Sequence, residues 1–207
     1  MEQNLHVQQT YRKPYSPNYF FLKQLNALSP ENDASQKYNS LGKKHNLTNS
    51  SSKRRIIMHV DLNAFYPSCE MIRDPSLVGK SVIVVMSPEP EGQLTRGVVA
   101  SCSYEAREFG VRAAMPYVQA KKLCPDGVFK RTDFTVYNSI SLKIMKLLDE
   151  YSDRLEQASI DEAYLDVTEK IVQIGGSKEL ALTIKNALRE KVGLICSIGV
   201  APTKASA

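Results

Sequence analysis

The spacing of apolar residues predicts an ordered region from residue 56 onward, built of short strands and amphipathic helices. Short apolar or alternating runs are typical of strands, and apolar residues three or four apart, such as Val136, Ile140 and Ile144, are typical of a helix. The predicted strands are 56–60, 82–86, 98–101, 128–130, 155–160, 163–167 and 195–200. The predicted helices are 63–73 with Asn63 as its N-cap, 104–109 ended by Gly110, 116–123, 134–151 and 177–191. Because hairpins and crossovers are mixed, the pattern predicts the α+β class.

Residues 1–55 have a different composition, rich in Asn, Gln, Ser and Lys, and we expect a disordered tail. Only 19–28 have the spacing of a short amphipathic helix. The tail holds nine basic and three acidic residues, whereas residues 56–207 hold eighteen and nineteen, so the net charge of +5 resides in the tail. A basic arm of this kind contacts nucleic acid or acidic surfaces, or serves only to keep the chain soluble.

The composition also excludes several classes of protein. The longest apolar run is five residues, far below the roughly 20 that span a bilayer, so we expect no membrane contact. The first 30 residues lack the apolar segment of a secretory signal. The four cysteines have neither zinc-ligand spacing nor a disulfide framework, which favours an intracellular protein, cytoplasmic or, in a eukaryote, nuclear.

Three acidic residues stand at the ends of predicted strands. Asp61 follows the first strand, and Asp161 and Glu162 lie between two apolar strands in SIDEAYLDV. At a tight bend their carboxylates converge and repel one another, and Mg²⁺ or Mn²⁺ would remove that repulsion. The alternatives are a capping role for Asp61 and two solvated turn carboxylates. His59, inside the first strand, is expected to be structural.

A second group has the chemistry of a phosphate site. Tyr104 and Arg107 are three residues apart, so one helical face presents a phenol and a guanidinium together. Ser101 lies just before them with a hydroxyl donor. The alternative is an ordinary surface arginine.

Several ordered segments resemble one family. The segments are HVDLNAFYPSCE, VVASCSYEAREFGVRAAMP, YNSISLKIMKLL, SIDEAYLDVT and GVAPTKASA. Together they resemble the Y-family DNA polymerases, in particular the DNA polymerase IV branch, over about residues 55–207. One departure is Asn63, where many members carry Asp.

The resemblance implies a domain organisation and an activity. It places a polymerase palm, a ferredoxin-like mixed sheet with helices, at 56–66 and 134–207, and a small fingers subdomain at 67–133. The family extends a primer by template-directed nucleotidyl transfer from dNTPs, past damaged bases and without proofreading. The chain stops before the triphosphate-binding lysine, the thumb and the DNA-gripping domain. We therefore expect a monomeric fragment with little activity of its own, whose missing C-terminal region would contact a sliding clamp.

The same resemblance assigns roles to single residues. The catalytic, metal-binding carboxylates would be Asp61, Asp161 and Glu162, with the carbonyl of Leu62 as a further ligand for two Mg²⁺ ions, or Mn²⁺. The nucleotide contacts would be Phe65 beside the nucleotide, Tyr66 as the steric gate under the sugar, and Ser101, Tyr104 and Arg107 on the triphosphate. The partners would be dNTP and primer-template DNA.

Two other functions stay open. Besides the polymerase, the first alternative is a binding module that holds metal and nucleotide or DNA without catalysis, and the second is a different palm enzyme such as a nucleotide cyclase. The motif from Tyr104 to Arg107 argues against the cyclase. Primer extension, with ATP cyclisation as the control, separates the three.

Overall fold

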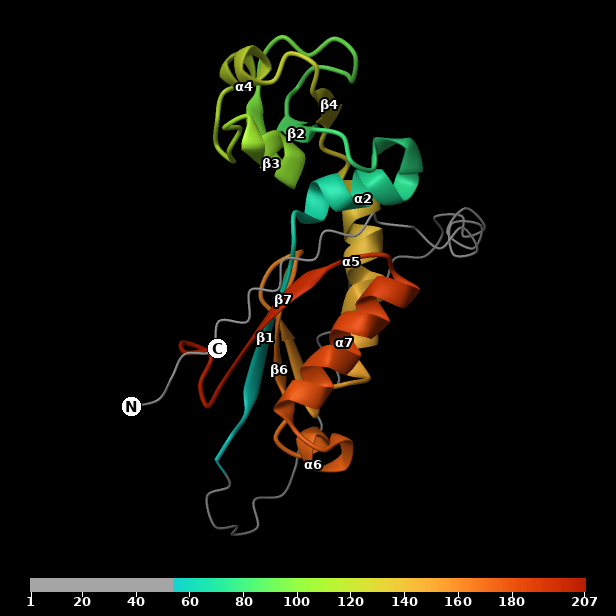
Figure 1. Cartoon of the computed structure of the whole chain (residues 1–207), viewed down its shortest axis with the longest axis vertical. Coiled ribbons are helices and arrows are strands. Elements are labelled where there is room, and N and C mark those ends of the chain that lie inside the picture. Colours follow the sequence, from blue (N-terminus) through green and yellow to red (C-terminus); the bar gives the residue numbers. More distant parts are fainter. Residues whose placement is uncertain (1–53) are drawn as a thin grey trace.

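The computed structural model describes residues 54–207, which form two β-sheets with their helices (Figure 1). The first sheet has the strand order β5-β6-β1-β7, and every neighbouring pair in it is antiparallel. Its strands are β1 (Ile57–Leu62), β5 (Arg154–Gln157), β6 (Glu162–Asp166) and β7 (Cys196–Ala201). Its helices are α5 (Phe134–Asp149), α6 (Lys170–Ile174) and α7 (Ser177–Lys191). In Figure 1, α5 and α7 lie on one side of this sheet.

The second sheet has three strands in the order β3-β2-β4. They are β2 (Val82–Met86), β3 (Val98–Cys102) and β4 (Val128–Arg131), with β3 antiparallel and β4 parallel to β2. Two short helices accompany them, α3 (Tyr104–Glu108) and α4 (Tyr117–Leu123). Between the two sheets in the chain come α2 (Phe65–Arg73) and the 3₁₀ turn η2 (Pro75–Leu77). In Figure 1, α2 lies between the second sheet and the top of the first.

The main core lies between the first sheet and its helices. Alternate residues of β1, namely Met58, Val60 and Leu62, are buried because the sheet is covered on that face. Helix α7 faces them with Leu180, Ile184 and Leu188, which recur every fourth residue and so share one helical face. Helix α2 adds Phe65, Cys69 and Ile72 to the same core. Burying each large apolar side chain contributes about 1.5–3 kcal/mol, so these faces determine how the helices dock.

A smaller core lies within the second sheet. It joins Ile83, Val85, Val99 and Cys102 to Ala106 of α3 and Ala120 of α4. Val84, which alternates with these residues along β2, belongs to the main core instead. The second sheet is therefore packed on both faces, by its own helices on one and by the α2 region on the other.

The α+β prediction is confirmed, and each predicted strand and helix is present, β2 and α7 with the predicted ends and the others with shifted ends. One strand was predicted to run to residue 160, but β5 ends at Gln157 because residues 158–161 form a bend before β6. Helix α6 was not predicted. The predicted tail and the helix over 19–28 lie outside the described residues.

The prediction that Asn63 caps α2 is wrong. The N-cap is Ala64, in the left-handed conformation with φ 44°, and no side chain caps this helix. Asn63 is engaged by β7 and the residue before it instead: its backbone N–H donates to the Ile195 carbonyl at 2.9 Å, and its side-chain Oδ1 accepts from Ser197 Oγ at 3.0 Å. The Asn63 side chain, which the local sequence predicts as a helix cap, thus makes a tertiary hydrogen bond instead.

Candidate active site

The three candidate acids lie at one end of the first sheet, two of them on its open face. Residues of β1 and β6 alternate, so His59, Asp61, Glu162 and Tyr164 lie opposite the face that α5 and α7 cover. The antiparallel register places Asp61 directly across from Glu162. No helix of residues 54–207 packs on this face in Figure 1. Folding therefore brings together two acids that are a hundred residues apart in the chain.

Asp161 joins this pair from the bend that precedes β6. Its carbonyl accepts a hydrogen bond from the Leu62 amide at 3.0 Å, which fixes the bend against the end of β1. Ser159 Oγ donates to Asp161 Oδ1 at 2.7 Å. From α5, the buried Ser141 hydroxyl donates to the Ile160 carbonyl at 2.5 Å. The bend is thus anchored on two sides, and the Asp161 carboxylate is held by its own loop.

The carboxylates of Asp61, Asp161 and Glu162, which we call the acidic corner, repel one another. Burial raises the pKa of Asp61, and the negative charges of Glu162 and Asp161 raise it further, while His59 opposes them. His59 Nε2 lies 3.9 Å from the Glu162 carboxylate and makes no hydrogen bond, and its ring stacks on Tyr164. A cation bound at the corner would relieve this repulsion.

The acids are neighbours without forming a closed ligand cage. Within residues 54–207, no three His, Cys, Asp or Glu side chains gather closely enough to hold a metal ion as they stand. The donor set still fits a hard divalent cation, because it consists of carboxylate oxygens that repel one another at a partly exposed sheet end.

Tyr66 stands beside the acids on the first turn of α2. Burial raises the pKa of its hydroxyl, and the charge of Asp161 is the next cause, which indicates how near the two residues are. The Tyr66 ring is half-buried and stacks on Tyr137 of α5 at 4.7 Å. Phe65, the preceding residue, is 2% exposed and lies in the main core. Tyr66 is therefore near enough to the acidic corner to feel the charge of Asp161, and Phe65 supports the helix from within the core.

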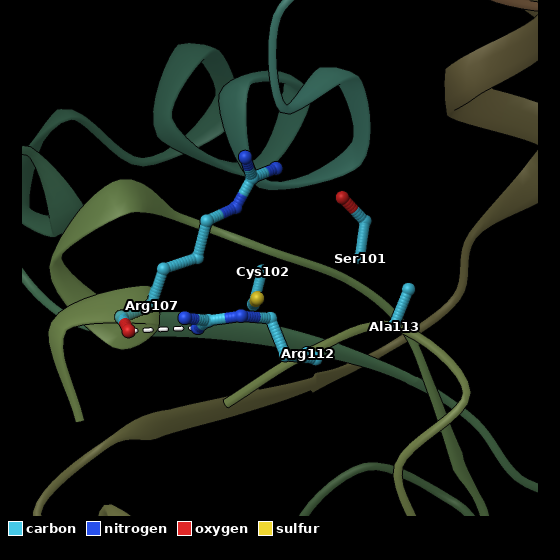
Figure 2. Close-up of a pocket in the computed structure, with 5 residues that line it drawn as sticks. All are labelled: Ser101, Cys102, Arg107, Arg112 and Ala113. Carbon is cyan, nitrogen blue, oxygen red and sulfur yellow. Dashed lines mark hydrogen bonds between the residues drawn. The ribbon is translucent and has the colours of Figure 1, made fainter. Parts of the chain in front are cut away.

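A pocket of about 340 Å³ opens beside the second sheet, lined by Ser101, Cys102, Arg107, Arg112 and Ala113 (Figure 2). In Figure 2, the Arg107 guanidinium and the Ser101 hydroxyl extend to one side of the pocket and Arg112 lies on the other. The Arg107 guanidinium sits 4.8 Å from the centre of the exposed Tyr104 ring, a cation–π contact that confirms the predicted helical pairing.

Arg112 is a pocket residue that the sequence did not reveal. Its Nη1 donates to the carbonyls of Arg107 and Val111, both at 2.7 Å, and so closes the end of α3. Two guanidinium groups thus line one pocket with a hydroxyl, which is suited to an anion such as a phosphate. A sequence rule based on helical spacing could not find Arg112, because it lies beyond the end of that helix.

Comparison with known proteins identifies the family of the chain. Residues 60–207 match the impB/mucB/samB family. The chain is 50% identical to DNA polymerase IV of Methanoculleus marisnigri over 153 residues, 74% of this chain and 42% of that protein. It is 40% identical to DNA polymerase IV of Bacillus anthracis over 150 residues, 72% of this chain and 35% of that protein.

Solved structures show the same likeness. A DinB protein from Sulfolobus solfataricus is 38% identical, with a TM-score of 0.67, over 73% of this chain and 43% of that one. An insertion ternary complex of Dbh DNA polymerase is 37% identical, with a TM-score of 0.66. The chain spans about two fifths of the length of these relatives. No helix among the described residues is long and apolar enough to cross a membrane. Because the family model covers most of the chain and these relatives share more than a third of its aligned residues, the chain belongs to the impB/mucB/samB family, that of the Y-family DNA polymerases.

Proposed function

We propose that the chain is the palm and fingers of a translesion DNA polymerase, which adds dNTPs to a primer 3′-hydroxyl on a DNA template. In this proposal the four-stranded sheet is the palm and the three-stranded sheet is the core of the fingers. The observation that carries it is the pairing of Asp61 with Glu162 beside Asp161 on an open sheet face. Relatives named DNA polymerase IV, at 40–50% identity, support the reaction class.

The acidic corner is the proposed metal site. Asp61, Asp161 and Glu162, with the Leu62 carbonyl, would hold Mg²⁺ or Mn²⁺. When bound, the ions supply Lewis-acid chemistry: they neutralise phosphate charge and activate the primer hydroxyl. The anchored bend would hold the Asp161 carboxylate in place for this role. No protein nucleophile is required.

The pocket and Tyr66 are the proposed nucleotide contacts. Arg107, Tyr104 and Ser101 would bind the triphosphate, since charge-assisted bonds from guanidinium to phosphate are strong and directional. Tyr66, next to the acidic corner, would lie against C2′ of the sugar and clash with a 2′-hydroxyl. The sequence-based assignment of Phe65 as a nucleotide contact does not fit its burial in the main core, so Phe65 would instead hold the helix beside the nucleotide. A sliding clamp would be contacted by regions that the relatives have beyond the matched segment.

Primer extension tests this function in a polymerase-length protein. Residues 54–207 are joined to the C-terminal portion of the Methanoculleus marisnigri relative, which is 50% identical over the matched part. Asp61→Asn and Glu162→Gln should each lower extension roughly 10³-fold, because charge stabilisation at the reacting phosphate is lost.

The matched control is Asp166→Asn, which changes a carboxylate on the same strand and face as Glu162 and should keep most of the activity. Extension that survives both corner substitutions would refute the proposal. Cyclisation of ATP by the same protein would favour the cyclase alternative.

A further inference from the structure

Glu70 is a charged residue in an unexpected place. It is 4% exposed, on the core side of α2 beside Cys69, and no other charged residue among 54–207 is buried. A buried carboxylate is costly unless it is bonded. Tyr137 Oη donates to Glu70 Oε1 at 2.8 Å, and Arg73 Nη1 lies 3.5 Å from the same oxygen. Because replacing a buried ion pair by apolar residues is often neutral or stabilising, stability by itself does not explain a carboxylate at this position.

The partner of Glu70 sits in the middle of an aromatic group. Tyr137 is fully buried, and its ring stacks on Tyr66 at 4.7 Å with 16° between the ring planes. Phe65 and Phe134 meet the Tyr137 ring edge-on at 6.5 and 6.2 Å. Phe134 also meets Tyr66 edge-on at 6.0 Å. One face of Tyr66 therefore rests on Tyr137, which is enclosed by the other two rings.

The hydrogen bond fixes where Tyr137 lies. Stacking by itself lets one ring slide over another, whereas a bond at the end of the ring sets its position along α5. Burial raises the pKa of the Tyr137 hydroxyl, and the bond to Glu70 raises it further, so the hydroxyl keeps its proton and stays a donor. A satisfied buried network of this kind specifies one arrangement.

We propose that Glu70 and Tyr137 are positioning residues for sugar selectivity, because together they hold the Tyr66 ring where a 2′-hydroxyl would strike it. This inference rests on the proposed function, in which Tyr66 contacts the incoming sugar. A steric gate discriminates only if it cannot retreat. Tyr66 is half-buried, so its own packing does not keep the ring in place. The stacked Tyr137 ring, held by its hydrogen bond to Glu70, opposes a displacement of the Tyr66 ring.

The test compares dNTP and NTP incorporation in the polymerase-length protein described above. The double variant Glu70→Met with Tyr137→Phe removes both bonding partners and keeps the apolar volume, so stability should change little. Its ratio of kcat/KM for dNTP over NTP should fall about three- to tenfold, since part of the overpacking that opposes the 2′-hydroxyl is relieved. Glu70→Gln, which keeps an acceptor for Tyr137, should retain the ratio within about twofold.

Two controls make the result decisive. Ile144→Ala lowers stability two turns further along α5, and it should leave the ratio unchanged although the melting temperature falls. Tyr66→Ala measures the gate itself. If Tyr66→Ala lowers the ratio and the double variant does not, the supporting role of Glu70 and Tyr137 is refuted. If Tyr66→Ala has no effect, the proposed gate is wrong and this inference falls with it. If the double variant does not fold, Tyr137→Phe alone carries the same expectation.

Discussion

Asp61 should destabilise the metal-free protein, although it is at the centre of the proposed active site. It stands directly opposite Glu162 and beside Asp161, and burial together with these two charges raises its pKa. Directly opposite side chains in an antiparallel pair are about 5 Å apart. Two unit charges at that distance repel by about 0.8 kcal/mol in water and about 3 kcal/mol at an effective dielectric of 20. Because Asp61 is partly exposed, we take about 1 kcal/mol.

Asp61→Asn should therefore raise the melting temperature of the 207-residue chain in EDTA at about pH 7.5 by about 2–4 °C. The raised pKa of Asp61 determines how the stability difference between the variant and the parent changes with pH. Asp61 binds a proton more readily in the folded state than in the unfolded state. The destabilisation by its charge is therefore complete above the pKa of Asp61 in the folded state, and it disappears below the unfolded-state pKa of about 3.9. The advantage of the variant should shrink toward about pH 4. A variant that melts lower than the parent, or an advantage that does not depend on pH, would contradict the reasoning.

Asp166 is the matched control with the opposite sign. Burial opposes its ionisation, but hydrogen bonds from Thr168 and Arg55 outweigh burial and hold its pKa below the ordinary value. Its contribution to stability is present above the unfolded pKa and is lost as pH falls through the folded one. Asp166→Asn should lower the melting temperature at about pH 7.5, and the deficit should close on acidification. Two carboxylates on one sheet face thus respond in opposite directions.

Three further predictions follow from the same geometry. Mn²⁺ at about ten times its dissociation constant should raise the melting temperature of the chain by about 3–6 °C, and Asp61→Asn should lose most of this gain in the same thermal scan; an equal gain in both would place the ion elsewhere. In the polymerase-length protein, Arg107→Ala should raise KM for dNTP about 10- to 100-fold, since a charged bond to phosphate is worth about 1.5–3 kcal/mol. Lys122→Ala, which removes an exposed charge on α4, should leave the KM for dNTP unchanged in the same steady-state assay. An equal rise in KM for both variants would show that the pocket is not the phosphate site. Gly97 has φ 137°, and a Cβ there would lie 2.5 Å from a β2 carbonyl oxygen, so Gly97→Ala should cost about 2–4 kcal/mol in urea unfolding. Gly92→Ala, where nothing lies within 4 Å, should cost only about 1 kcal/mol, and equal losses would argue against the clash.

Local pattern was sufficient for much of this protein. Periods of two and of three to four residues located the strands and helices, because side-chain direction repeats with the backbone. The helical offset between Tyr104 and Arg107 predicted a contact that is present. The acids were visible as polar residues at the ends of apolar strands, and the ordered motifs indicated the family.

Distant contacts decided the rest. The sequence placed Asp61 and Glu162 each at a strand end, but their facing positions depend on the register of β1 and β6, which the buried faces of the whole sheet determine. Asn63 has the side chain of a helix cap, yet a hydrogen bond from β7 engages it, because a tertiary partner competes with a local one. Glu70 resembles any polar residue on a helix. Only the packing of α2 against α5 buries it, supplies Tyr137 as its donor, and makes a charged side chain part of the support for Tyr66.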